Sequence, residues 1–167
     1  MLEFYGSKPF FSNDGNWLFY YSKSDKTAVC RKLATGETYK FLKIQDYNNK
    51  YSHALSVNND LFVVSSYYYE LGVFKFPSME KIWESTSSGE ESLVAISPDG
   101  KFVAQLKSDS YNPSKVRILN LETKKWIMEL EADYRSYGMG FNPGGNLLLV
   151  EAIKNTYYGS HQHDIYN

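Results

Sequence analysis

Several residue types are scarce in this chain of 167 residues, and each scarcity excludes a class of protein. The single cysteine, Cys30, rules out an intrachain disulfide framework and a cysteine-rich zinc site. Basic and acidic residues nearly balance, 18 against 19, for a net charge of −1. Binding to nucleic acid needs a clustered basic excess that this balance does not supply, so we expect no nucleic-acid partner.

Long apolar runs are also missing. No stretch approaches the roughly 18 residues that span a bilayer, and the N-terminus lacks the basic and apolar blocks of a secretory signal. No window has a convincing amphipathic helical period either. We therefore expect a cytoplasmic protein with no membrane partner, whose apolar residues, 43% of the chain, form a β-rich core.

A short motif that recurs four times is the main positive feature. The four copies lie at 12–17, 56–61, 97–102 and 142–147. Their common turn position is held by Gly15, Asn59, Gly100 and Gly145. The spacings are 44, 41 and 45 residues. Glycine and asparagine are the residues that a turn position with positive φ selects, so the motif predicts four equivalent tight turns.

A second motif recurs out of phase with the first, at 30–37, 73–80 and 118–125. Its apolar positions Leu33, Phe76 and Leu121 are spaced by 43 and 45 residues. Short β-rich runs lie between the motifs, at 61–66, 101–107, 115–121 and 126–131. Each repeat therefore predicts four antiparallel strands, A to D, with the first motif joining A to B and the second joining C to D. Four strands in about 40 residues is the unit of a β-propeller blade.

The two motifs resemble turns of a known family. AISPDGKF at 95–102 resembles the strand A to B turn of WD-repeat propellers, and LATGE at 33–37 resembles their strand C to D turn. The chain is thus similar to the divergent WD-repeat, WD-like or TolB-like β-propellers. The Trp-Asp pair that names the family is replaced by Arg-Lys at 31–32, Phe-Lys at 74–75 and Leu-Asn at 119–120. We therefore expect blades held by apolar packing between sheets.

The repeats predict an all-β fold and one repeat array over residues 1–167, with about four blades present. In chain order the sequence gives a strand D near 2–5, three A-to-D sets, and then A, B and part of C. Three arrangements fit this order. The chain is an excerpt of a larger propeller, it associates with itself to complete a ring, or the N-terminal strand closes a small four-bladed monomer.

Motifs of catalysis are missing. The chain has no nucleophile elbow, P-loop, dinucleotide fingerprint, EF-hand loop or HExxH, so we expect neither an enzyme nor a cofactor. His161 and His163 would lie on one side of an extended segment and could begin a zinc or copper site, but a third ligand is missing. A polar loop between strands B and C is the preferred interpretation of these histidines. Cys30, on a predicted strand C, fits a buried apolar position.

Tyrosine is unusually abundant, and ten of the fifteen tyrosines lie in or beside connections from B to C or from D to A. These connections leave a propeller blade on one face. Tyrosine combines a large contact area with a hydroxyl group and a low entropy cost, and arginine is favoured at contact hot spots. The alternative is that some tyrosines cap the core between blades. The candidate binding residues are Tyr47, Tyr51, Tyr67, Tyr68, Tyr69, Tyr111, Tyr134, Arg135, Tyr137, Tyr157 and Tyr158.

The sequence therefore predicts a non-enzymatic scaffold that binds a protein or peptide through this tyrosine-rich face. The alternative is an accessory or partial propeller of a larger enzyme. A TolB-like peptidase, with catalysis in another domain, and a sugar-processing propeller, with tyrosines stacked on the sugar rings, are examples.

Overall fold

The structure is a computed structural model, and every regular element that it describes is a β-strand. The described residues are 9–22, 24–43, 51–58, 60–66, 71–85, 91–108, 114–132, 135–153 and 161–166. Within these ranges no helix is long and apolar enough to cross a membrane.

The strands form four antiparallel sheets, in each of which spatial order follows chain order. The first sheet contains β1 (Phe10–Phe11), β2 (Trp17–Ser22), β3 (Thr27–Lys32) and β4 (Thr38–Lys43). The second contains β5 (Tyr51–Leu55), β6 (Leu61–Ser66), β7 (Leu71–Lys75) and β8 (Lys81–Ser85). The third contains β9 (Glu91–Ile96), β10 (Phe102–Ser108), β11 (Ser114–Asn120) and β12 (Lys125–Ala132). The fourth contains β13 (Arg135–Phe141), β14 (Leu148–Ile153) and β15 (His161–Tyr166).

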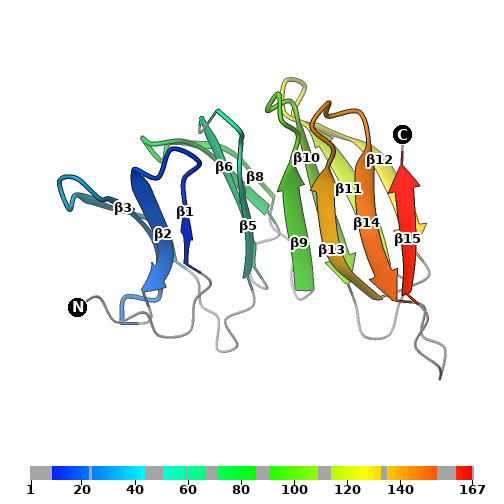
Figure 1. Cartoon of the computed structure of the whole chain (residues 1–167), viewed down its shortest axis with the longest axis horizontal. Helices are drawn as coiled ribbons and strands as arrows, with labels where there is room; N and C mark the ends of the chain where they lie inside the picture. The colour runs from blue at the N-terminus through cyan, green and yellow to red at the C-terminus, as the bar shows by residue number, and fades with distance from the viewer. Residues whose placement is uncertain are drawn as a thin grey trace.

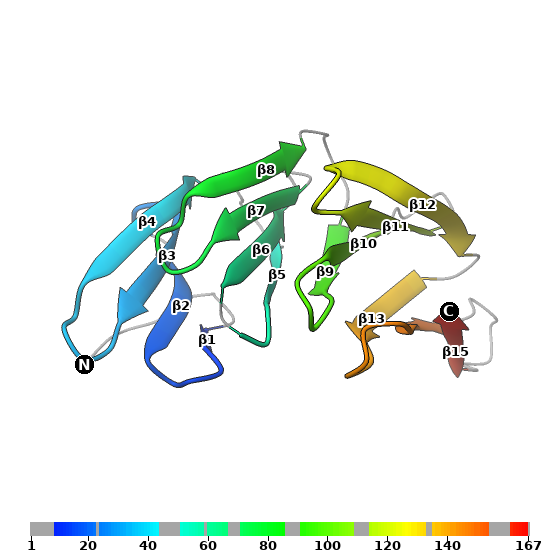
Figure 2. The same ribbon diagram turned by 90° about the horizontal axis from the view of Figure 1, so that it is seen from above.

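This order confirms the predicted fold, a partial β-propeller of four-stranded antiparallel blades. The sheets stand side by side in an open arc, with the first and fourth at opposite ends (Figures 1 and 2). The A strands β1, β5, β9 and β13 line the inside of the arc, and the D strands β4, β8 and β12 line the outside (Figure 2). The described strands therefore do not close into a four-bladed ring. The strand D expected near 2–5 lies outside the described residues.

Apolar packing between neighbouring sheets forms the core, as predicted. The cluster between the first and second sheets contains Trp17, Phe19, Cys30, Phe62, Val64, Phe74 and Phe76. The cluster between the second and third contains Val63, Leu71, Val73, Val94, Val103 and Leu119. The cluster between the third and fourth contains Ala104, Leu106, Val116, Leu148 and Val150. Burial of each large side chain contributes about 1.5–3 kcal/mol, so these interfaces are the main source of stability.

The repeated turns adopt the backbone conformation that the sequence predicts. Gly15, Gly100 and Gly145 have φ of 69°, 72° and 72° in the A–B turns, and Asn59 lies outside the described residues. The aligned C–D turn positions also have positive φ, at 74°, 57° and 56°. They are Gly36, Met79 and Lys124. The second motif therefore fixes a left-handed turn position even where a side chain makes it costly.

The outer strands share one irregularity. Each D strand carries a register shift, or β-bulge, against its C strand: β4 against β3, β8 against β7 and β12 against β11. The ladder between β14 and β15 instead pairs six consecutive residues without a shift, from Leu148 with Tyr166 to Ile153 with His161.

Candidate interaction faces

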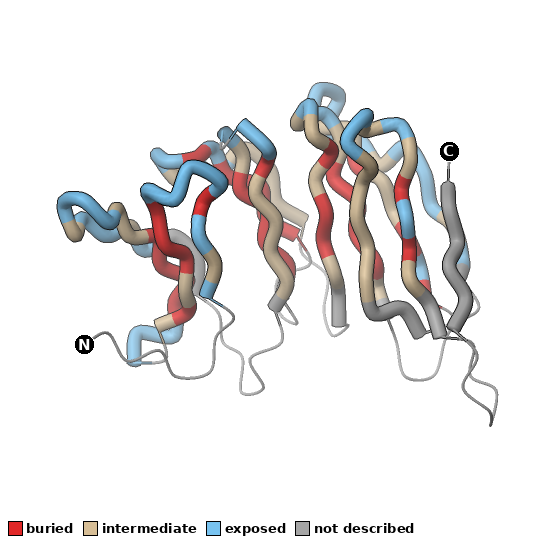
Figure 3. Tube along the Cα trace, in the orientation of Figure 1, coloured by how far each residue is buried: buried red, intermediate tan, exposed pale blue. Residues whose placement is uncertain are grey.

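The arc has two faces that differ in how the strands are joined. The A–B turns and the C–D turns lie on one face, which we call the turn face (Figure 1). Strands B and D finish, and strands C and A begin, on the opposite face, which we call the connection face. Figure 3 shows buried positions in the strands and exposed ones in the turns of the turn face.

The predicted binding residues fall into two groups. Eight of them lie outside the described residues: Tyr47, Tyr67, Tyr68, Tyr69, Tyr111, Tyr134, Tyr157 and Tyr158. The backbone positions of the other three, Tyr51, Arg135 and Tyr137, are in β5 and β13.

Two of these three residues lie at strand ends on the connection face. Tyr51 pairs with Ser66, the last residue of β6. Arg135 pairs with Ile153, which in turn pairs with His161. The structure thus brings Arg135 and His161 into one row of the fourth sheet, and the grouping of the tyrosine side chains stays a prediction.

The histidines of the C-terminal segment lie in a strand, so the predicted polar loop is wrong for them. His161 begins β15, and His163 pairs with Glu151 of β14. The physical reason is that β14 offers backbone partners along its whole length, and the C strand extends until these are used. No group of three histidine, cysteine, aspartate or glutamate residues that could hold a metal ion occurs in the described part of the chain.

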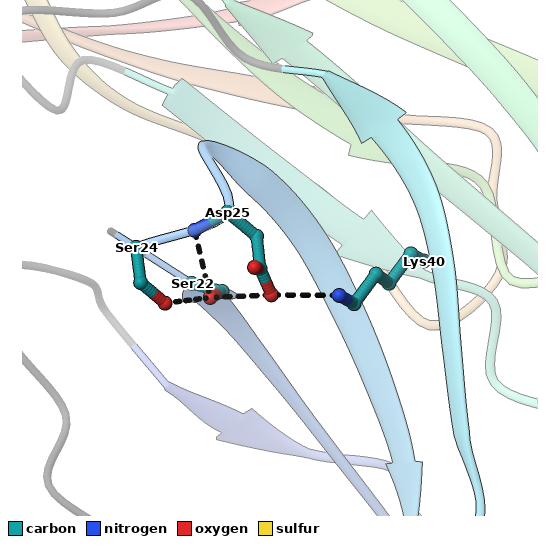
Figure 4. Close-up of polar contacts among 4 residues, drawn as sticks. All are labelled: Ser22, Ser24, Asp25 and Lys40. Atoms are coloured by element: carbon teal, nitrogen blue, oxygen red, sulfur yellow. Dashed lines mark hydrogen bonds and ion pairs between the residues drawn. The ribbon is translucent and has the colours of Figure 1, made fainter.

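A polar cluster at the B–C turn of the first sheet is the best described part of the connection face (Figure 4). The Lys40 Nζ atom lies 2.8 Å from Asp25 Oδ2. The Ser22 hydroxyl donates to Asp25 Oδ2 at 3.1 Å and lies 3.2 Å from the hydroxyl of Ser24. The hydrogen bonds from Lys40 and then Ser22 lower the pKa of the Asp25 carboxyl. The connection face therefore presents an exposed ion pair to solvent.

Sequence reasoning missed this cluster. The run from Ser22 to Lys26 is polar and signals a turn, but Lys40 comes from β4, the strand next to β3 in the sheet. Only the β3–β4 pairing, in which Val29 lies opposite Lys40, brings the amine near the carboxylate.

The turn face is held together by a buried serine in each of the first three sheets. In the third sheet, the Ser97 hydroxyl accepts from the Phe102 backbone N–H at 2.9 Å and donates to Asp99 Oδ1 at 2.7 Å. Ser12 and Ser56 make the same two kinds of bond in their sheets. Asn142 takes this place in the fourth sheet and accepts from Leu147 N–H at 2.9 Å. The polar groups of these turns are therefore used within the fold.

These hydrogen bonds change the acidity of the turn carboxylates. The Ser97 hydroxyl is the main cause that lowers the pKa of Asp99, followed by the Lys101 backbone N–H. The Ser12 hydroxyl and the Asn16 side chain lower the pKa of Asp14 in the same way. Both carboxylates thus serve as hydrogen-bond acceptors within their own turns.

Neighbouring A–B turns also contact one another. The Asn13 side-chain amide donates to the carbonyl oxygens of Ser56 and Val57, at 3.1 Å in both cases. A Cβ added at Gly100 would lie 3.2 Å from the Leu61 side chain, so these turns approach closely. The turn face is consequently a packed base that links successive sheets.

A second charged cluster lies on the outer strands of the second and third sheets. The Arg117 guanidinium lies 3.9 Å from the centre of the Trp126 ring, and the Trp126 and Trp83 rings make a T-shaped contact with their centres 5.6 Å apart. Glu129 Oε2 lies 3.2 Å from Arg117 Nε as an ion pair, and Glu129 Oε1 accepts a hydrogen bond from Lys115 Nζ at 3.3 Å. These ion-pair and ring contacts join β8, β11 and β12.

Cys30 is buried, as predicted. It is fully buried in the cluster between the first two sheets, and burial raises the pKa of its thiol to about 12. The nucleophilic thiolate is therefore negligible at neutral pH.

Comparison with known proteins identifies the class of the chain by fold alone. No family model matches it, and no curated protein matches it. It is similar to a solved chain of hydrazine synthase from Kuenenia stuttgartiensis, with a TM-score of 0.73 at 15% identity. The match covers 94% of this chain and 49% of that chain, so this chain spans about half the length of the solved one. Because 889 solved chains match, the likeness defines a common architecture and selects no activity.

Proposed function

We propose that the chain is a WD-like propeller segment that acts as a non-enzymatic scaffold and binds a protein or peptide through its connection face. The distribution of tyrosine carries the proposal. Eight of the fifteen tyrosines lie in chain segments that join strand B to C or strand D to A, and Tyr51 and Tyr137 lie within three residues of such a segment. Large, rigid side chains with a polar tip are enriched where proteins contact proteins.

The contrast with the turn face supports this assignment. The serine hydroxyls and carboxylates of the A–B turns are hydrogen-bonded within their own turns, so these polar groups are already used by the fold. On the connection face, the Asp25–Lys40 pair is exposed, with 43% and 58% of the side chains accessible. Arg135 adds a charge of the type favoured at hot spots. Such a face suits a peptide that has aromatic or apolar side chains beside charged ones.

Replacement of Tyr67, Tyr68 and Tyr69 by alanine tests the proposal. A peptide ligand is first selected from a displayed random library against the wild-type chain, and its Kd is measured by calorimetry. We expect the triple variant to weaken binding by about tenfold or more, because buried tyrosines at hot spots each contribute over about 1 kcal/mol.

The matched control is the double variant Leu33→Ala and Val57→Ala, which removes two exposed apolar side chains from the turn face. It should keep the wild-type Kd. Loss of binding in this control together with an unchanged triple variant would assign recognition to the turn face and contradict the proposal.

An accessory segment of a larger enzyme is the second candidate. The observation that favours it is the match to about half of a chain from hydrazine synthase. The gene sequence on either side tests it, because an open reading frame that continues into a domain with a nucleophile elbow would favour a peptidase. Quenching of tyrosine fluorescence by oligosaccharides would instead favour a sugar-processing propeller.

A further inference from the structure

One pair of apolar positions recurs at every interface between sheets. The first position, which we call the front, directly precedes each A–B turn and is held by Phe11, Leu55, Ile96 and Phe141. The second, which we call the back, is on strand B and is held by Phe19, Val63, Ala104 and Leu149. In each interface the back residue of one sheet shares an apolar cluster with the front residue of the next. The observed pairs are Phe19 with Leu55, Val63 with Ile96 and Ala104 with Phe141.

At each end of the arc, one position of this pair has no partner from a neighbouring sheet: the front position of the first sheet and the back position of the fourth sheet. The back residues Phe19, Val63 and Ala104 are at most 2% exposed, whereas Leu149 is 45% exposed. The front residue of the first sheet, Phe11, is 61% exposed. A large aromatic and a leucine thus face solvent at the two positions that are covered in all three internal interfaces.

The surroundings of Leu149 have room for a bulky side chain. Gly140 pairs with Leu149 across the β13–β14 ladder and therefore lies on the same side of the fourth sheet. A Cβ added at Gly140 would meet nothing within 4 Å. The outer side of the fourth sheet thus has a leucine beside an open space, which complements a phenylalanine ring.

We infer that this surface binds the first sheet of a second copy of the chain, with Phe11 of one copy against Leu149 of the other. The two residues cannot meet within one chain, because the first and fourth sheets lie at opposite ends of the arc (Figure 2). An interface between unlike surfaces adds copies head to tail, and the series of copies ends when it closes into a ring. Two arcs that are joined at both ends form such a ring, with two-fold symmetry.

A comparison of lengths agrees with two copies. This chain matches 49% of the solved chain to which it is similar, so two copies together are about as long as that one chain. Contiguous exposed apolar surface is also costly in water, and covering both ends removes it by an interface of the kind that already exists three times in the arc.

The mass of the protein in solution tests the number of copies. Native mass spectrometry and light scattering should give twice the chain mass of 19.3 kDa. Leu149→Asp and Phe11→Asp should each weaken the dimer by about tenfold or more, because a charge would be buried without a partner. The matched control is Ile127→Asp, which alters an aliphatic side chain of β12 that is 54% exposed but lies away from both ends. It should remain a dimer.

Site-directed cross-linking tests the geometry without a disruptive charge. Phe11→Cys and Leu149→Cys are made in separate chains, and the buried Cys30 adds no reactive thiol. Oxidation of the mixture should produce a covalent dimer, and oxidation of either variant alone should not. A disulfide formed by Phe11→Cys alone would mean that like surfaces meet, and would overturn the proposal.

Three further outcomes would also overturn it. A monomer across the accessible concentration range would mean that the ends stay open or are covered by other parts of a longer polypeptide. A mass of three or more copies would contradict the ring of two. A dimer that persists in both aspartate variants would place the interface elsewhere.

Discussion

A single buried serine illustrates how side chains stabilise the repeat. Ser97 is fully buried, yet its hydroxyl both accepts from the backbone and donates to Asp99. The hydroxyl thereby fixes both ends of the A–B turn, and the carboxylate it serves also accepts from the Lys101 backbone N–H at 3.1 Å. Removal of one partner would leave a buried donor or acceptor unsatisfied, which costs about 1–3 kcal/mol.

The acidity of Asp99 predicts a dependence of stability on pH. Because its pKa is lowered from 3.8 in the folded state, the unfolded chain binds more protons in this range. Its contribution is complete above the unfolded pKa and is lost as pH falls through the folded pKa. We expect Asp99→Asn, which keeps an oxygen acceptor, to flatten the loss of unfolding free energy between about pH 5 and pH 2. Denaturant unfolding at each pH measures it.

Ser97→Ala is the companion variant for this test, because it removes the main cause of the lowered pKa and should flatten the same acid limb. A wild-type slope in both variants would show that other carboxyl groups determine the acid sensitivity.

At the scale of elements, the C–D turns place three different residues in one left-handed conformation. Gly36, Met79 and Lys124 occupy it in successive sheets. A residue other than glycine there costs about 1–2 kcal/mol, whereas glycine costs about 0.4–1 kcal/mol through the entropy of the unfolded chain. The conformational cost to a residue other than glycine is the larger of the two, so glycine gives the more stable fold where the side chain makes no other contribution.

Exchange at this turn position tests that balance. Lys124 is exposed, so we expect Lys124→Gly to raise the free energy of unfolding by about 0.5–1 kcal/mol. Gly36→Ala should lower it by a comparable amount. Met79 packs against the cluster between the first two sheets, so Met79→Gly also loses burial and should give no such gain. Thermal and urea unfolding report all three, and a stabilised Gly36→Ala would contradict the account.

The elements and the turns could be predicted from the sequence because each repeat encodes them locally. The strand at Leu61–Ser66 and the positive φ at Gly15, Gly100 and Gly145 follow from residues close in the chain. The Asp25–Lys40 pair and the Asn13 bonds to the next turn could not be predicted, because they join strands or sheets. The repeat period aligns positions but does not say which side chains meet across an interface.

At the scale of the whole molecule, the apolar clusters of the described residues join each sheet to its neighbours along the chain. Inner strands also contact one another at two of these interfaces, β5 and β6 with β9, and β9 and β10 with β13. Stability is then close to a sum over sheets and interfaces, as in other repeat arrays. The second and third sheets have two interfaces each, and the first and fourth have one.

This arrangement predicts a gradient of amide exchange. In the Leu149→Asp variant, we expect slow exchange in β6, β7, β10 and β11 and faster exchange in β2 and β14, because the end sheets open at a lower cost. In the wild-type chain, a ring of two copies should protect the end sheets and flatten the gradient. Hydrogen exchange read by mass spectrometry measures both, and uniform protection in the variant would contradict nearest-neighbour stability.

The register shifts of the outer strands have a consequence for how the protein behaves when concentrated. Bulged edges are poor templates for adding another strand, so β4, β8 and β12 give the outer rim of the arc resistance to runaway edge-to-edge aggregation. Among the outermost described strands, β15 has a straight ladder, six residues long. Of these described strands, β15 is therefore the better template for an added strand, and a proline or a lysine in β15 would best improve solubility.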